Sequence, residues 1–338
     1  MNEIIIPLNC NSGDNNLQKQ YNHQHMSTED TAGKEDNNVS VCANCGKGEE
    51  ESDSLKTCTA CKMVKYCNRE CQIAHRPQHK KECKKRAAEL HEEALFKHPP
   101  PEKDCPICFI RLPALDTGQA YMSCCGKVIC SGCIHAPLYN DQGNEVDNQK
   151  CPFCRTPSPK SIEEENKRAR KRMQAGDAEA FNMVAGHYVD GTRSMPQDWA
   201  KANELYLKAG ELGFAGAYHN LGNSYYDGRG VEVDKKKAVH YFELAAMGGR
   251  GNEAARHNLG NIEGQAGNHD RALKHFMIAV KYGCNYSLET IRVMYSCGNA
   301  TKDDYIRALR AYQTYSAEIK SKQRDEAAAY SDKYKYIE

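Results

Sequence analysis

Hydrophobic positions recur at helical intervals through the second half of the chain. Three segments show the pattern: residues 200–213 (AKANELYLKAGELG), 236–249 (KKAVHYFELAAMGG) and 270–283 (DRALKHFMIAVKYG). Apolar residues three and four apart predict a helix with one buried face, and a glycine at the end of each segment is typical of a helix C-terminus. This part of the chain is therefore expected to be helical.

The three segments also repeat one another at a nearly constant distance. The equivalent residues Ala202, Ala238 and Ala272 are spaced by 36 and 34 residues. One helix pair of this length cannot bury its own apolar face, so the pairs must stack into a solenoid. We expect a degenerate fourth unit around residues 291–315, followed by a polar helix to about residue 330 that caps the array.

The first half of the chain has no such periodicity. Residues 1–40 are rich in Asn, Gln, Ser, Asp and Gly, so they cannot bury enough apolar surface to offset the entropy of ordering. They are predicted to form a disordered tail. A helical stretch is expected from residue 84 to about 97, ended by the prolines at 99–101.

Composition adds a metal-binding signal. Of 18 cysteines, 15 lie between Cys42 and Cys154, at short repeated spacings that favour metal ligands over disulfides. The formal charge of +1 gives no general attraction to nucleic acid or membranes, and no segment has the roughly 18 apolar residues of a membrane span. The apolar run at residues 4–6 is a poor secretory signal, so an intracellular location, cytoplasm or nucleus, is expected.

The first cysteine module, residues 42–83, offers eight candidate ligands, enough for two tetrahedral zinc sites. These are Cys42, Cys45, Cys58, Cys61, Cys67, Cys71, His79 and Cys83. A two-residue gap in a turn, or a three-residue gap on one helical face, lets both side chains of a pair reach one ion. Spacing alone does not decide which pairs share an ion.

The string SLKTCTACKMVKYCNRECQIAHRPQHKKEC in this module resembles the MYND finger. The resemblance implies an interleaved pairing, with Cys42, Cys45, Cys67 and Cys71 on one zinc and the other four ligands on the second. It also implies binding of proline-containing peptides, with Gln72 in the peptide site. Arg76 stands where the family commonly has tryptophan.

The second cysteine module, residues 105–154, again offers eight candidate ligands. These are Cys105, Cys108, Cys124, Cys125, Cys130, Cys133, Cys151 and Cys154. The neighbouring Cys124 and Cys125 could bind one ion from a turn before Gly126, because the sulfurs of a zinc tetrahedron lie about as far apart as successive alpha carbons. His135 is an alternative ligand to Cys124.

The strings CPICFIRLPALDTG, CCGKVICSGC and CPFCRTP resemble a RING finger with only cysteine ligands. The resemblance implies that Cys105, Cys108, Cys130 and Cys133 share one zinc and the remaining four cysteines the other. Lys127 stands where the common RING pattern has a histidine ligand, and a lysine ammonium cannot bind zinc. The two modules together are thus expected to hold four zinc ions.

The same resemblance implies ubiquitin-ligase activity. A RING ligase aligns a ubiquitin-charged conjugating enzyme for attack without forming a covalent bond itself. Ile107 and Pro152 would line the groove for the conjugating enzyme, and Arg155 would bridge to ubiquitin. Each has an ordinary alternative role, as packing, turn former and linker charge respectively.

The repeats resemble Sel-one-like repeats, which are related to the tetratricopeptide repeat. The segment LGNSYYDGRGVEVDKKKAVHYFELAAMGG carries the resemblance most clearly, and NLGN occurs at 220–223 and again at 258–261. The resemblance covers roughly residues 177–315 and implies a curved helical scaffold that binds proteins.

The basic cluster KRARKR at residues 167–172 has two interpretations. It resembles a nuclear-localisation patch. Ser161 and Glu164, however, have the spacing of a capping box, and acidic residues precede the basic ones by about four positions, which is typical of an exposed helix with salt bridges. The second interpretation is favoured.

The sequence thus predicts two small zinc-stabilised modules followed by an all-α solenoid. The expected boundaries are a tail at 1–40, a MYND-type finger with a helix at 41–98, a RING-like finger with a linker at 99–160, and repeats with a capping helix at 161–338. The predicted function is protein interaction, with ubiquitin ligation through a conjugating enzyme as an output. A non-catalytic adaptor is the alternative, and a DNA-binding regulator is less favoured. Membrane or nucleic-acid partners are not expected.

Overall fold

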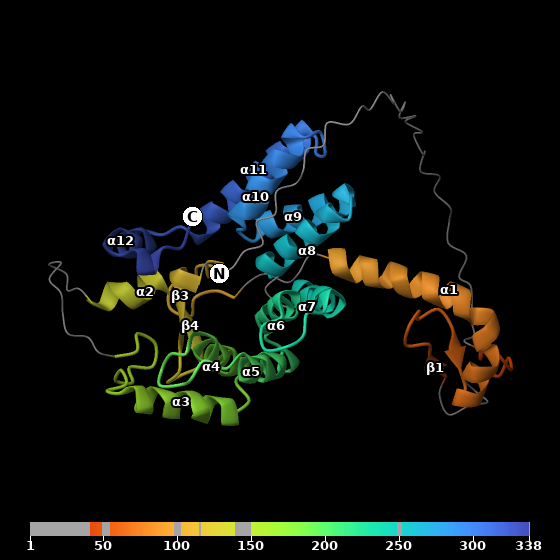
Figure 1. The fold of residues 1–338 in the computed structure, drawn as a ribbon, viewed down its shortest axis with the longest axis horizontal. Helices are drawn as coiled ribbons and strands as arrows, with labels where there is room; N and C mark the ends of the chain where they lie inside the picture. The colour runs from red at the N-terminus through yellow and green to blue at the C-terminus, as the bar shows by residue number, and fades with distance from the viewer. Residues whose placement is uncertain are drawn as a thin grey trace. The chain divides into compact units, whose positions relative to one another are not determined.

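A computed structural model describes residues 41–48, 55–97, 103–114, 116–138, 150–248 and 252–337. The predicted tail at 1–40 and the prolines at 99–101 lie outside the described residues. The described residues form two compact units, and the division falls between Leu95 and Phe96. Figure 1 shows their elements, coloured along the chain.

The first unit is built around the first module. Strands β1 (Lys56–Thr57) and β2 (Lys65–Tyr66) pair antiparallel, and helix α1 (Arg69–Phe96) follows. The predicted helix at 84–97 is the last part of this longer helix. Asn68 starts it early, because its side chain accepts the backbone N–H of Cys71 at 2.8 Å, as an N-cap does. Four buried residues form the small core: Cys42, Cys58, Cys61 and Tyr66.

The second unit begins with the second module. A short 3-10 turn, η2 (Asp116–Gly118), leads into an antiparallel hairpin of β3 (Gln119–Met122) and β4 (Lys127–Cys130). Helix α2 (Ser131–His135) and the 3-10 turn η3 (Ala136–Leu138) follow directly. Leu112 and Ile129 are buried beside the cysteines, so this module also has a very small apolar core.

The rest of the second unit is the predicted all-α solenoid. Its helices are α3 (Ile162–Gln174), α4 (Ala178–Asp190), α5 (Trp199–Glu211), α6 (Ala215–Asp227), α7 (Lys235–Met247), α8 (Glu253–Gln265), α9 (His269–Lys281), α10 (Asn285–Ser296), α11 (Lys302–Ile319) and α12 (Lys322–Tyr330), with a final 3-10 turn, η4 (Asp332–Tyr334). Sequential helices pack as pairs, α4 with α5, α6 with α7 and α8 with α9. The predicted fold class is confirmed.

Sequence signals explain where several of these helices begin and end. Asp177, Asp198 and Asp234 are N-caps whose carboxylates accept backbone N–H groups in the first turn. Gly191 and Gly228 follow α4 and α6 with φ values of 64° and 77°, a conformation that a glycine adopts without steric cost. The repeat period seen in the sequence is thus the length of one capped helix pair.

The recurring NLGN motif has a packing role. A side-chain carbon added at Gly222 in α6 would lie 2.6 Å from the ring of Phe242 in α7. One added at Gly260 in α8 would lie 2.5 Å from the ring of Phe276 in α9. In both repeats the glycine therefore makes room for an aromatic ring of the paired helix.

Both ends of the solenoid contact the second module. At the first end, the Tyr121 hydroxyl donates to the Asp177 carboxylate at 2.7 Å, beside the start of α4. At the last end, the Ala114 N–H donates to the Tyr315 hydroxyl at 2.7 Å, and the Thr117 hydroxyl donates to the Lys335 carbonyl at 2.6 Å. The second module and the repeats are therefore parts of one compact unit. None of the helices that the structure describes is long and apolar enough to cross a membrane.

Candidate metal centres and partner groove

Four groups of candidate ligands converge within the described residues. In each group the ligand atoms lie within 4.8 Å of one another. The groups are Cys42, Cys45, Cys67 and Cys71; Cys58, Cys61, His79 and Cys83; Cys105, Cys108, Cys130 and Cys133; and Cys124, Cys125, Cys151 and Cys154. These groupings are the ones that the two family resemblances imply.

Four tight turns present four of the five cysteine pairs that have a two-residue gap, and the fifth pair, Cys130 and Cys133, lies at the start of α2. In each turn the residue after the second cysteine donates its N–H to the carbonyl of the first cysteine, at 2.9 to 3.0 Å. That residue also has a positive φ in every case. The four residues are Gly46, Lys62, Phe109 and Arg155. This conformation turns both thiols of the pair to the same side, where they can share an ion.

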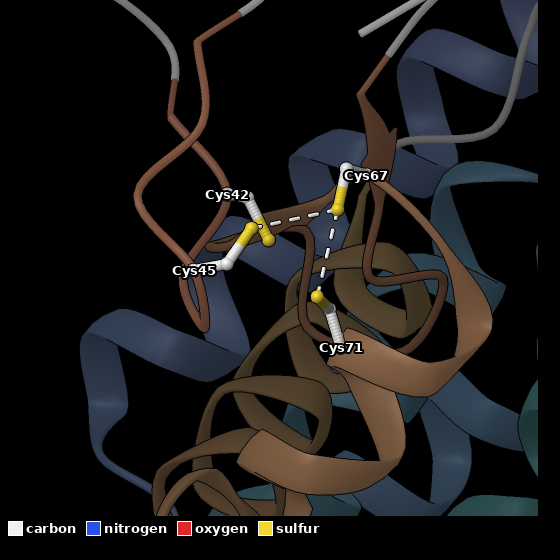
Figure 2. A group of neighbouring side chains, drawn as sticks. All are labelled: Cys42, Cys45, Cys67 and Cys71. Carbon is white, nitrogen blue, oxygen red and sulfur yellow. Dashed lines mark hydrogen bonds between the residues drawn. The ribbon is translucent and has the colours of Figure 1, made fainter. Parts of the chain in front are cut away.

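The first group joins a turn near the start of the first module to helix α1. Cys67 follows β2 and Cys71 lies in the first turn of α1, so the two sulfurs approach to 3.5 Å. The Cys45 and Cys67 sulfurs lie 3.6 Å apart. Figure 2 shows the four thiols pointing toward a common centre.

The second group uses one face of α1. His79 and Cys83 are one helical turn apart, and the Cys58 and Cys83 sulfurs lie 3.8 Å apart. The Nε2 atom of His79 lies 3.2 Å from the Cys61 sulfur. His75 stacks on His79 with ring centroids 5.6 Å apart, and its Nδ1 lies 3.1 Å from the Tyr66 hydroxyl. These contacts fix the orientation of the His79 imidazole.

The remaining two groups lie in the second module. Cys108 and Cys130 sulfurs are 3.8 Å apart in one group. In the other, the Cys154 and Cys124 sulfurs are 3.4 Å apart and the Cys125 and Cys151 sulfurs 3.9 Å apart. The neighbouring Cys124 and Cys125 thus both face the same partners.

The turn between β3 and β4 explains how adjacent cysteines do this. The N–H groups of Cys125 and Gly126 both donate to the Met122 carbonyl, and Gly126 has a φ of 68°. His135, the alternative ligand, lies outside this group and contacts the rings of Tyr330 and Tyr334 instead. Lys127 is exposed on β4.

The geometry of the four groups suits zinc. Zinc–sulfur bonds of about 2.3 Å in a tetrahedron place two sulfurs about 3.75 Å apart. The sulfur–sulfur distances of 3.4 to 3.9 Å bracket this value. Soft thiolates with one imidazole form a donor set that binds zinc in preference to magnesium or calcium. The residues present therefore fit the metal.

The pKa of Cys42 and of Cys154 is lowered, while a hydrogen bond with Cys71 raises the pKa of Cys67 and burial raises the pKa of Cys124. Burial raises the pKa of Cys42, but backbone N–H groups of Cys45 and Cys67 outweigh it and lower the pKa to about 6. A hydrogen bond with the Thr156 hydroxyl is the main cause that lowers the pKa of Cys154 to about 6. The thiolate is the form that binds a metal.

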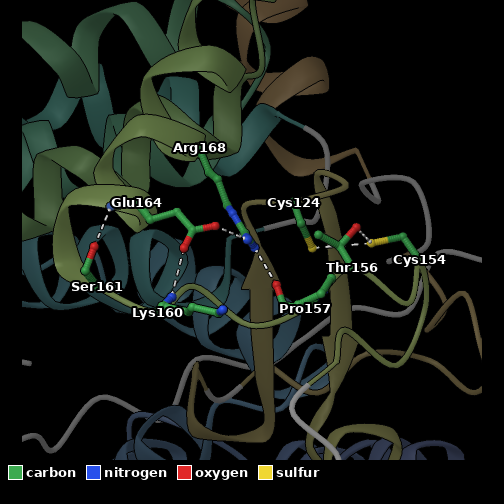
Figure 3. Close-up of polar contacts among 8 residues, drawn as sticks. All are labelled: Cys124, Cys154, Thr156, Pro157, Lys160, Ser161, Glu164 and Arg168. Carbon is green, nitrogen blue, oxygen red and sulfur yellow. Dashed lines mark hydrogen bonds and ion pairs between the residues drawn. The ribbon is translucent and has the colours of Figure 1, made fainter.

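The linker that follows Cys154 is tied to helix α3 by one half of the predicted capping box, because the Glu164 side chain bonds the N–H of Lys160 and not that of the N-cap Ser161. The Ser161 hydroxyl accepts the Glu164 N–H at 3.2 Å, and Glu164 accepts the Lys160 N–H at 2.9 Å. Arg168 forms an ion pair with Glu164 and donates to the Pro157 carbonyl at 2.9 Å (Figure 3). One residue of the basic cluster therefore has the structural role that the salt-bridged-helix interpretation predicts.

Beside the second module lies a groove of about 370 Å³. It brings together Ile107, Pro152 and Arg155, the three residues predicted to contact a conjugating enzyme. Its other lining residues are Cys108, Cys133, Ala136, Pro137 and Gln323. Polar and apolar surface contribute about equally to the wall, and Arg155 and Gln323 are its polar side chains.

Sequence reasoning missed the residues that lie far along the chain from the module. Gln323 in α12 lines the groove, yet no local pattern connects it with cysteines more than a hundred residues earlier. Arg172 in α3 is another such residue, because it donates to the carbonyls of Ser123 and Cys124 at 3.4 and 3.3 Å. In the first module, Gln72 and Arg76 are exposed on α1.

Comparison with known families identifies two parts of the chain. The family model described as MYND finger matches residues 42–83, and the Sel1 repeat model matches residues 178–214 and 215–249. The predictions of a MYND finger and of Sel-one-like repeats are confirmed. None of the curated proteins matches the chain.

Two solved structures are similar to part of the chain. A Sel1 repeat protein from Oxalobacter formigenes is 25% identical with a TM-score of 0.42, and the match covers 47% of this chain and 66% of that protein. A protective antigen of uropathogenic Escherichia coli strains, which displays an SLR fold, is 26% identical with a TM-score of 0.41. That match covers 52% of this chain and 38% of the antigen. The chain thus spans less than two thirds of either protein.

Proposed function

We propose that this chain, which carries a MYND finger and Sel1 repeats, is a zinc-dependent protein-interaction protein that acts as a RING-type ubiquitin ligase. In this proposal the second module engages a ubiquitin-conjugating enzyme. The repeats, and the MYND finger, recruit the protein to be modified. The groove that gathers Ile107, Pro152 and Arg155 is the observation that carries the proposal.

Four zinc ions would stabilise the two modules. Each of the four ligand groups has four donors at distances that suit one tetrahedral ion. Both modules have apolar cores of only a few residues. Structural zinc can contribute on the order of 10 kcal/mol to the folding of such small modules. Zinc would therefore supply the folding energy and take no part in bond making.

The groove has the chemistry of a protein-docking site. Ile107, Ala136, Pro137 and Pro152 offer apolar contact, and Arg155 offers a guanidinium at one side. A small pocket that combines apolar surface with a few polar groups can accept an inserted partner side chain. A conjugating-enzyme loop with an apolar tip would suit it.

Arg155 would act at the edge of the groove. It follows Cys154 directly, and its φ of 62° belongs to the tight turn that presents the last cysteine pair. A planar guanidinium can hold two carbonyl groups at once. Arg155 would thus contact the conjugating enzyme and ubiquitin together, and catalysis would come from holding the thioester in an orientation that a lysine can attack.

A non-catalytic adaptor is the second candidate. It is favoured by the two family matches, because MYND fingers and Sel1 repeats both support protein interaction without chemistry. In that case the groove would hold a partner peptide and no ubiquitin transfer would follow. One assay separates the two candidates.

The test is a ubiquitination assay of the full chain, loaded with zinc, against a panel of conjugating enzymes. Wild type is compared with Ile107→Ala and Arg155→Ala. Lys62→Ala is the matched control, because Lys62 occupies the position of Arg155 in a turn of the first module. Zinc content and circular dichroism of each variant show that it is folded.

Ubiquitin chains are expected from wild type and from Lys62→Ala. Both groove variants are expected to lose activity by about 10-fold or more, which corresponds to about 1.4 kcal/mol of lost partner or transition-state contact. An absence of chains with every conjugating enzyme, from folded and zinc-loaded protein, would contradict ligase activity. The adaptor would then be the better description.

A further inference from the structure

Helix α12 is packed against the second module, although more than 180 residues separate it from α2 along the chain. The contact is close enough to involve backbone atoms. A side-chain carbon added at Gly132 in α2 would lie 2.8 Å from the backbone nitrogen of Arg324 in α12. Only glycine allows this approach at residue 132. Figure 1 shows α12 lying along α2.

Arg324 joins the helix to the loop that follows the first cysteine pair of the second module. Its side chain is fully buried. One terminal nitrogen donates to the carbonyls of Arg111 at 2.8 Å and Ile319 at 2.6 Å, and the other donates to the Ile110 carbonyl at 3.2 Å. If α12 moved away from the second module, the buried guanidinium would lose these acceptors, and the fold would be strongly destabilised. Arg324 therefore holds α12 against the module.

The Ile110 carbonyl links this contact to the metal site. It also accepts the backbone N–H of Cys105 at 2.9 Å, a second hydrogen bond across the turn of the first cysteine pair. Arg324 therefore orients the backbone that presents Cys105 and Cys108. Groups that orient metal ligands in this way typically change metal affinity by about 10 to 100-fold when they are removed.

Gln323, the neighbour of Arg324, completes the partner groove. It is exposed, and it lines the groove with Ile107, Pro152 and Arg155. Arg324 fixes the first turn of α12, so Gln323 has a fixed position in the wall. Its amide can both donate and accept a hydrogen bond, which suits the backbone of a docked loop.

We propose that the partner groove is a composite surface, which the second module forms only together with the C-terminal helix α12. Gln323 is a specificity-determining residue that hydrogen-bonds the backbone of an inserted conjugating-enzyme loop. Arg324 is a positioning residue that keeps helix and metal loop together. The identity of the partner rests on the proposed function, whereas the role of Arg324 in zinc retention does not.

The groove is tested with Gln323→Trp, whose indole would fill the space where a partner loop inserts. Glu326→Trp is the matched control, because Glu326 is exposed on the same helix but does not line the groove. The measurement is the dissociation constant of the full, zinc-loaded chain for each conjugating enzyme of the panel. Ile107→Ala is measured alongside.

Binding is expected to weaken by about 10-fold or more for Gln323→Trp and for Ile107→Ala, and to remain at the wild-type level for Glu326→Trp. Wild-type affinity in Gln323→Trp, with weakened binding in Ile107→Ala, would overturn the composite groove and leave the proposed function standing. If no conjugating enzyme binds wild type, the proposed function and Gln323 as its specificity residue fail together.

The positioning role is tested by the rate at which a chelator removes zinc from Arg324→Met and Arg324→Lys. Zinc of the second module is expected to leave about 10-fold faster from Arg324→Met, while zinc of the first module leaves at the wild-type rate. Arg324→Lys keeps the charge but lacks the fork of donors, so it is expected to restore the rate only in part. Wild-type rates in Arg324→Met would overturn the positioning role.

Discussion

At the scale of single residues, the four cysteine turns share one demanding backbone position. Gly46, Lys62, Phe109 and Arg155 all have φ values between 56° and 76°, but only the first is a glycine. A residue with a side chain has a cost of roughly 1 to 2 kcal/mol in this conformation. The turns form despite this cost because the hydrogen bond in each turn and the shared metal site of its two cysteines fix the backbone conformation. A side chain kept at such a position despite the strain is therefore a candidate for contacting a partner.

The cost can be measured at Lys62, which no functional proposal involves. Lys62→Gly is expected to stabilise the first unit by about 0.5 to 1 kcal/mol, because glycine adopts the left-handed region without strain. Lys62→Val is expected to destabilise it by more than that, because a branched side chain fits this region poorly. Thermal unfolding at a fixed free-zinc concentration measures both changes.

Met63→Gly serves as the control for the added flexibility of a glycine. Met63 is exposed, and its φ is not positive. Its replacement should lower stability slightly, since glycine only adds freedom to the unfolded chain there. If Lys62→Gly lowered stability by the same amount as Met63→Gly, the argument from backbone strain would be wrong.

At the scale of helices, the glycines of the repeats have two different roles. Gly222 faces the ring of Phe242 at a distance that leaves no room for a methyl group, whereas a side-chain carbon at Gly186 in α4 would meet nothing within 4 Å. Both lie inside helices, where alanine is intrinsically favoured over glycine by about 1 kcal/mol. At each position, the space around the glycine decides whether the higher helix propensity of alanine or a steric clash has the larger effect on stability.

Opposite outcomes are therefore expected for the same substitution. Gly186→Ala should stabilise the second unit by up to about 1 kcal/mol. Gly222→Ala should destabilise it by about 1 to 3 kcal/mol, because the ring of Phe242 must move. Thermal unfolding followed by circular dichroism, which reports mostly the solenoid, is the measurement. A stabilised Gly222→Ala variant would show that the ring moves at little cost.

Several elements could be predicted from the sequence because their causes are local. Helical spacing around Ala202, Ala238 and Ala272 predicted the second helix of each pair, and Asp or Ser at the helix starts supplied caps. Helix α1 was predicted too short because its early start depends on the Asn68 cap, although the three-residue gap between His79 and Cys83 already suggested a shared helical face. Pro77 lies inside α1, and because proline is unfavourable in a helix interior, helix propensity does not predict a helix there.

At the scale of the whole molecule, contacts between residues that are far apart along the chain could not be predicted from the sequence. Pairs such as Cys105 and Cys108 are visible as spacings, but their grouping with Cys130 came only through family resemblance. The contacts of Arg172 and Arg324 with the second module have no sequence signal, because they join residues that only the folded solenoid brings together. The groove wall at Gln323 was missed for the same reason.

The same contacts link metal binding to the fold of the second unit. Arg172 from one end of the solenoid bonds the loop of Cys124, and Arg324 near the other end bonds the loop after Cys108. Each ligand group of the second module therefore has an anchor on the helical repeats. Zinc in that module would stabilise the contacts at both ends.

The most direct test of this account is the number of zinc ions on the intact chain, measured by native mass spectrometry. Wild type is predicted to carry four, one for each ligand group, and Cys124→Ser to lose or weaken one in the second module without loss from the first. A chain that is folded and saturated with only two zinc ions, both in the MYND finger, would contradict the account. The groove would then lack the metal-built loops on which its proposed function depends.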